Sequence, residues 1–92
     1  MILSFQHRGL KRLYERGDAS RLPADKLTRI EDIMAALDVA TEPAALDRPS
    51  FRLHQLKGNR SGQWSITVRA NWRITFRFEG TNVVDVDLED YH

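Results

Sequence analysis

Cysteine is absent from the 92-residue sequence. This absence excludes a disulfide framework and thiolate metal sites, and a reducing cytoplasm is the simplest location for such a chain. Long apolar runs are absent too, since none approaches the roughly 20 residues that a helix needs to cross a bilayer. The early polar residues Gln6, His7 and Arg8 are not typical of a signal peptide. We therefore expect a cytoplasmic protein with no membrane contact.

Proline and glycine are scarce, with three and five residues respectively. They form no linker, and the sequence shows no repeat and no low-complexity segment. A hydrophobic content of 41% and a charged content of 29% are typical of a globular protein. We expect a single domain over residues 1–92 with a modest core, because so short a chain buries only about 60–65% of its extended surface.

Acidic residues are missing from the stretch between Phe51 and Phe78, which carries six basic ones. The segment from Glu79 to His92 is the reverse, with five acids and no lysine or arginine. The basic block could bind a polyanion such as nucleic acid. Alternatively, basic and acidic strands could lie side by side and pair their charges. The charge pattern alone leaves both interpretations open.

The first half of the sequence predicts two helices. Leu10 and Leu13 belong to a short amphipathic segment that Gly17 ends. A second helix is expected within residues 18–40, where one apolar stripe is interpreted as core packing. The stripe consists of Leu27, Ile30, Ile33, Met34 and Leu37. A short helical turn is expected at Pro43–Leu46.

The second half alternates apolar and polar residues with a period of two, which predicts strands. Three strands are expected at residues 63–70, 73–78 and 84–89, with a weaker one at 52–57 and an edge strand at 1–5. The expected fold is α+β, with two N-terminal helices packed on one face of a small antiparallel sheet. The open face would display Thr67, Arg69, Arg73, Thr75 and Arg77.

Common catalytic motifs are absent. The three histidines lie far apart and lack the spacing of a zinc site, and no phosphate-binding loop or GxSxG elbow is present. We expect no metal and no cofactor.

Acid–base chemistry beside positive charge remains. Internal cleavage of RNA requires a base for the 2′-OH, cations for the phosphate and an acid for the leaving 5′-oxygen. The proton-transfer candidates are His54, Asp90, Tyr91 and His92, and the cationic candidates are Lys57, Arg60 and Arg73. DNA could not react in this way, because it lacks the 2′-OH.

Each candidate also has a simpler interpretation. His54 could merely pack beside the sheet, and His7 is interpreted as a surface residue at a helix start. Tyr91 and His92 could be idle surface residues. Trp64 has the spacing of a core residue, whereas Trp72 could serve either the core or base stacking.

Longer motifs show a family resemblance. The sequence contains "SFQHRGLKRLYERGD", then "LHQLKGNRSGQWSITVRANWRITFRFE", and it ends in "VDVDLEDYH". In these segments the chain resembles the HigB branch of the RelE-like toxins, the plasmid maintenance system killer proteins of bacterial type II toxin–antitoxin pairs. The resemblance implies the fold expected above and a cytoplasmic bacterial protein.

The resemblance also implies an activity and partners. Such toxins enter the ribosomal A site and cut mRNA there by attack of the 2′-OH, which inhibits translation. A HigA-like helix-turn-helix antitoxin binds the toxin, neutralises it and reads the operator DNA, so that the toxin meets DNA only indirectly. A catalytically decayed toxin that acts only as an antitoxin-binding co-regulator is the alternative, and a free ribonuclease is a third possibility.

The site residues follow from the same resemblance. The family's catalytic surface corresponds here to His54 and to Asp90, Tyr91 and His92. The basic residues around the family's cleft correspond to Lys57, Arg60 and Arg73. Apart from the resemblance, Asn71, Trp72 and Arg73 are candidates for contacts to RNA bases. Either histidine could be the base and the other the acid, although the terminal carboxylate beside His92 favours the acid role for it. Asp90 is expected to orient a histidine or contact RNA.

Overall fold

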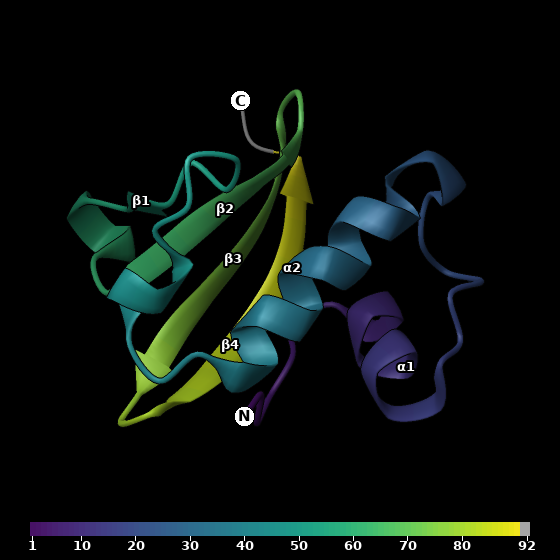
Figure 1. The fold of residues 1–92 in the computed structure, drawn as a ribbon, viewed down its shortest axis with the longest axis horizontal. Coiled ribbons are helices and arrows are strands. Elements are labelled where there is room, and N and C mark those ends of the chain that lie inside the picture. Colours follow the sequence, from purple (N-terminus) through teal and green to yellow (C-terminus); the bar gives the residue numbers. More distant parts are fainter. Residues whose placement is uncertain (91–92) are drawn as a thin grey trace.

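The computed structural model describes residues 1–90, in which two α-helices precede four strands (Figure 1). The helices are α1 (Arg8–Arg16) and α2 (Leu27–Val39). The strands are β1 (His54–Gln55), β2 (Gln63–Arg69), β3 (Trp72–Glu79) and β4 (Asn82–Asp90). Short 3-10 turns are η1 (Ala24–Lys26), η2 (Pro43–Leu46) and η3 (Gly58–Arg60). The predicted helices, the strands of the second half and the turn at Pro43–Leu46 are thus present.

Helix α1 is bounded by a cap at each end. The Leu10 amide donates a hydrogen bond of 3.2 Å to Nδ1 of His7, which precedes the first turn. Gly9 leaves room for this ring, because a Cβ there would lie 2.8 Å from His7 Cε1. At the other end Gly17 has a φ of 68°, the left-handed conformation that glycine adopts most readily. Gly17 therefore ends the helix as predicted.

Helix α2 packs against the sheet and supplies much of the core (Figure 1). Ile30, Ile33 and Leu37 are fully buried and join Ile66 and Ile74 in one apolar cluster. The predicted apolar stripe is confirmed as core packing, with Leu27 at its partly buried margin. Burial of each such side chain stabilises the fold by about 1.5–3 kcal/mol, so this helix–sheet contact contributes a large share of the stability.

The sheet is antiparallel, with the strand order β1-β2-β3-β4. β2, β3 and β4 correspond to the three predicted strands, while the weaker fourth strand is reduced to the two residues of β1. The N-terminal segment pairs with β4 only through two isolated parallel bridges, Ile2↔Val83 and Phe5↔Val86, so the predicted edge strand at residues 1–5 is not formed as a strand. One edge of the sheet is therefore very short, and the first half of the other edge is paired with the N-terminal segment.

A bulge interrupts β4 where the N-terminal segment meets it. The register shifts between Thr75 and Arg77, and Asp85 has a φ of 56°. The Asp85 amide donates a hydrogen bond of 2.9 Å to Ser4 Oγ. The N-terminal segment thus satisfies a backbone group that the bulge removes from the ladder.

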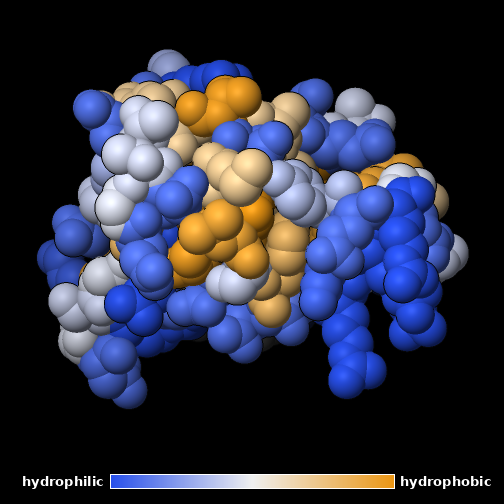
Figure 2. All heavy atoms as spheres, turned by 90° about the horizontal axis from the view of Figure 1, so that it is seen from below, coloured by the Kyte–Doolittle hydropathy of each residue, from blue (hydrophilic) through white to orange (hydrophobic). Residues whose placement is uncertain are grey.

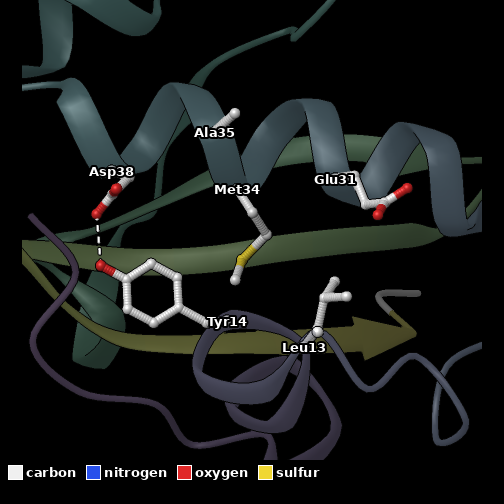
Figure 3. Close-up of a pocket in the computed structure, with 7 residues that line it drawn as sticks. Leu13, Tyr14, Glu31, Met34, Ala35 and Asp38 are labelled. Atoms are coloured by element: carbon white, nitrogen blue, oxygen red, sulfur yellow. Dashed lines mark hydrogen bonds between the residues drawn. The ribbon is translucent and has the colours of Figure 1, made fainter.

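Asp38, near the C-terminal end of α2, connects three segments of the chain. The Tyr14 hydroxyl donates a hydrogen bond of 2.6 Å to Asp38 Oδ1, across a groove between α1 and α2 that Leu13 and Met34 also line (Figure 3). The Ile2 amide donates to the same oxygen at 3.3 Å. The hydrogen bond to Asp38 raises the pKa of Tyr14 above its ordinary value of 10.0, because ionised Tyr14 would lose this bond and face a carboxylate.

The face drawn in Figure 2 is mostly hydrophilic. Figure 2 shows apolar side chains gathered at the centre of one face, with hydrophilic ones around them. The exposed large apolar side chains of the described residues are Met1, Leu3, Tyr14 and Val39. No helix within residues 1–90 is long and apolar enough to span a bilayer.

Candidate functional site

The sheet face that α2 leaves uncovered carries rows of polar side chains. His54 lies opposite Ser65, Ser65 opposite Thr75, and Thr75 opposite Asp87, so one row crosses all four strands. Directly opposed residues point to the same face of a sheet. A second row joins Thr67, Arg73 and Glu89. Ile66 and Ile74 point into the core, and the polar residues that alternate with them along β2 and β3 therefore lie together on the opposite face.

A cavity of about 340 Å³ opens on this face. Its lining consists of Arg52, His54, Leu56, Ser65, Thr67, Ala70 and Arg73. The predicted catalytic histidine His54 and the predicted cation Arg73 thus share one cavity. Nη1 of Arg73 donates a hydrogen bond of 2.6 Å to Thr67 Oγ1, which fixes the guanidinium against the wall formed by β2. An imidazole beside two guanidinium groups can bind an anion and exchange a proton with it.

Two lining residues have unusual backbone conformations. Arg52 has a φ of 49° and Ala70 a φ of 51°, values that non-glycine residues rarely adopt. Each costs on the order of 1–3 kcal/mol unless the surroundings stabilise it, and such positions cluster at functional sites. This strain at both sides of the cavity supports its assignment as the site.

Arg60 forms the strongest ionic contact on this face. Its guanidinium donates to both carboxylate oxygens of Glu89, at 3.0 and 2.6 Å, while Nε donates to Gln63 Oε1 at 2.6 Å. The Thr75 hydroxyl adds a bond of 2.5 Å to Glu89 Oε2. The bonds from Arg60 lower the pKa of Glu89, and the bond from Thr75 lowers it further, because both favour the carboxylate. Arg60 therefore ties η3 to β4.

Some residues of the basic block form ion pairs with residues of the acidic block. Arg77 lies 3.8 Å from Asp85 on the neighbouring strand, and Arg60 pairs with Glu89 as described. Within residues 1–90, no carboxylate lies within 4.0 Å of Arg52 or Lys57. The pairing of strands thus accounts for some of the basic block, and exposed cations remain beside the cavity.

Two expectations for the open face are wrong. A register shift between Thr67 and Arg69 places Arg69 opposite Trp72, and Arg69 instead forms an ion pair of 3.8 Å with Asp25 of η1. The bulge inserts one residue, which reverses the face to which Arg69 points. Thr75 is on the expected face but is buried rather than displayed, with 1% of its surface exposed.

The predicted RNA-binding residues do not all gather at the cavity. Trp72 packs partly buried against the core, and Lys26 Nζ lies 5.6 Å from its ring centroid, so the ring lies on the α2 side of the sheet. Asn71 is exposed in the turn between β2 and β3, and Lys57 is exposed immediately before η3. The structure brings His54 and Arg73 together and leaves Trp72 apart from them.

The predicted C-terminal catalytic group is described only at its first member. Asp90 is exposed and ends β4 opposite Trp72. Tyr91 and His92 lie outside the described residues. Among residues 1–90, no cluster of three or more His, Asp or Glu side chains could hold a metal ion.

Ser65 is a member of the site that the sequence prediction missed. It is fully buried, it lines the cavity, and it lies directly opposite His54. The alternation of "QWSITVRA" does place Ser65 on the open face, but a serine on a strand carries no distinctive signal. Its position beside His54 depends on the register of β1, which the weak pattern of residues 52–57 does not define.

The chain is similar to proteins of one toxin family. A family model described as "RelE-like toxin of type II toxin-antitoxin system HigB" matches residues 3–92. A protein of Proteus vulgaris named "Endoribonuclease HigB" is 53% identical over 92 residues, and the match covers 100% of both chains. A solved structure, "YoeB/ParE toxin from Agrobacterium tumefaciens", superposes with a TM-score of 0.53, covering 97% of this chain and 93% of that one. Its sequence identity of 19% supports likeness of fold alone.

Proposed function

Because the chain belongs to the HigB-like family of RelE-like toxins from type II toxin–antitoxin systems, we propose that it is an endoribonuclease acting at the cavity between His54 and Arg73. The observation that carries this proposal is the shared cavity, where an imidazole meets fixed guanidinium charge on the polar face of the sheet. The name of the Proteus vulgaris relative supports the activity.

The proposed reaction is attack of the ribose 2′-OH on the adjacent phosphate. This step forms a 2′,3′-cyclic phosphate and releases a 5′-hydroxyl. One histidine, His54 or His92, removes the 2′ proton, and the other protonates the leaving oxygen. Arg73 lies where its charge can stabilise the phosphate in the transition state. Asp90 and Tyr91 complete the proposed group by orienting a histidine or contacting the RNA.

The cations have different proposed roles. Lys57 is exposed, directly follows the lining residue Leu56 in the chain, and serves as a contact for the RNA backbone. Arg60 already donates to Glu89 and Gln63, so a phosphate would share this guanidinium with them. Asn71, at the turn next to Arg73, is exposed and can contact a base. Trp72 is the weakest member of this set, because its ring packs against the core.

We further propose that cleavage depends on the ribosome and occurs on mRNA in the A site. The described part of the site offers few strong bases, so precise placement of the substrate by ribosomal RNA would supply much of the rate. A HigA-like antitoxin with a helix-turn-helix domain is the proposed partner that neutralises the toxin and binds their operator. Both statements extend the family assignment to this chain.

Primer extension on a reporter mRNA in a purified translation system tests the function. Wild-type protein should produce in-frame cuts that disappear when ribosomes are omitted. His54→Ala should reduce cutting by about 100-fold or more, since general acid–base catalysis typically contributes 10²–10⁴-fold. A variant lacking His92 tests the C-terminal group in the same assay.

His7→Asn is the matched histidine control. His7 caps α1 far from the cavity lining, and asparagine can keep the cap, so cutting should equal that of wild type. Cuts without ribosomes would instead identify a free ribonuclease. Folded wild-type protein that never cuts would contradict the proposal and favour a decayed toxin that acts only through its antitoxin.

A further inference from the structure

Two polar side chains face each other in the site without a bond between them. Ser65 Oγ is the one buried side-chain polar atom of the described residues that has no hydrogen-bond partner. Opposite it, the exposed imidazole of His54 forms no hydrogen bond or ion pair within residues 1–90. Both residues line the same cavity and are directly paired across β1 and β2.

An unpaired buried hydroxyl is unfavourable. Such a group loses its bonds to water, and this loss typically costs about 1–3 kcal/mol. Alanine would avoid the cost at a position where Ser65 is completely buried among strand residues. A serine here is therefore best explained by a partner that it meets in the working enzyme.

His54 is within reach of Ser65. The Cβ atoms of directly opposed residues on antiparallel strands lie about 4.5–5.5 Å apart. The imidazole is exposed and lines the same cavity as Ser65, so rotation about its side-chain bonds can turn it toward Ser65 Oγ.

We propose that Ser65 is a positioning residue that orients His54 for catalysis. Its hydroxyl oxygen accepts a hydrogen bond from Nδ1–H of His54, which fixes the tautomer and leaves the lone pair of Nε2 facing the cavity and Arg73. In histidine, the hydrogen bond made by one ring nitrogen determines which of the two nitrogens carries the proton. The inference rests on the proposed catalytic role of His54.

¹⁵N NMR of the histidine side chains at mildly alkaline pH tests the bond directly. The signals are assigned with His7→Asn and His92→Gln. His54 should be mainly the Nδ1–H tautomer in the wild-type protein and should shift toward Nε2–H in Ser65→Ala. An equal tautomer ratio in the two proteins overturns the proposal, and this readout does not depend on whether the protein cleaves RNA.

Cleavage and stability provide the second readout. Ser65→Ala should lower kcat about 10-fold or more in the translation assay, leave KM nearly unchanged, and leave Tm equal or higher. Ser65→Thr, which keeps the hydroxyl, should restore cutting, and Ser20→Ala should behave as wild type. A lower Tm for Ser65→Ala would show that the hydroxyl has a structural partner. Unchanged cutting would show that it does not orient His54. Either result overturns the proposal.

Absence of cutting by the wild-type protein would contradict the endoribonuclease activity. The tautomer ratio would still decide the role of Ser65.

Discussion

At the scale of single residues, the carboxylate of Glu89 accepts hydrogen bonds from two neighbouring side chains, which stabilise its ionised form. Arg60 and Thr75 donate to its carboxylate and lower its pKa from the ordinary value of 4.5. A lowered pKa means that the ionised carboxylate is more stable in the native state than in the unfolded state, so ionisation stabilises the fold. The resulting stabilisation is present above about pH 4.5 and is lost as the pH falls through the lowered pKa.

We therefore predict a pH-dependent effect of Glu89→Gln. The free energy of unfolding should fall by about 1–2 kcal/mol at pH 7, because charge-assisted bonds to Arg60 and Thr75 are weakened. The difference from wild type should shrink as the pH falls below about 4.5 and through the lowered pKa of Glu89, because the wild-type carboxylate then loses its charge. Urea denaturation at several pH values measures both effects.

Glu79→Gln provides the control for this comparison. Glu79 is exposed at the end of β3, so its substitution should change the unfolding free energy by less than about 0.5 kcal/mol at either pH. A Glu89→Gln effect that stayed constant down to pH 3 would show that the Arg60–Glu89 contact does not stabilise the fold through charge.

At the scale of secondary-structure elements, the stability of α1 depends on its caps. His7→Ala removes the side chain that accepts from the Leu10 amide and should destabilise the protein by about 1 kcal/mol. His7→Asn should recover most of the loss, since asparagine is a favourable capping residue. Urea denaturation together with amide exchange at Leu10 checks the prediction. Equal stability of the alanine and asparagine variants would contradict a capping role.

The sequence predicted the regular elements well because local patterns specify them. Gly17 ends α1, and the apolar stripe of α2 is buried, as helical periodicity indicates. The two β-bulges were not predictable, because each depends on how neighbouring strands fit rather than on any local signal. As a result the side of Arg69 was wrong, and the kink at Asp85 was not anticipated.

The candidate site was predicted in part. Resemblance placed His54 and Arg73 in one site, and the structure brings them into one cavity. The partners of Arg60 and the burial of Ser65 follow from tertiary packing, which periodicity does not encode. Trp72 was predicted as an RNA contact, because an aromatic residue next to a turn can either stack on a base or pack in the core. Only the tertiary structure shows that its ring packs against the core.

At the scale of the whole molecule, exposed cations on one face predict a salt-dependent affinity for RNA. Lys57→Gln should weaken binding of a short, non-cleavable 2′-O-methyl RNA and should reduce the slope of log K against log salt by about 0.7, the value for one phosphate contact on a single strand. Lys11→Gln on α1 is the matched control and should leave the slope unchanged. Fluorescence anisotropy across salt concentrations measures the slopes. Equal slopes for Lys57→Gln and wild type would remove Lys57 from the RNA-binding surface.

The two edges of the sheet limit how another protein can be recruited. β1 offers only His54 and Gln55 for main-chain pairing, and the first half of the opposite edge is already paired with the N-terminal segment through its bridges to Val83 and Val86. Recognition by strand addition requires a longer unpaired edge. Extended peptides designed to continue the sheet at β1 or beside Val83 and Val86 are therefore a poor starting point for an inhibitor, and side chains on the helices, the loops or the polar face offer more surface.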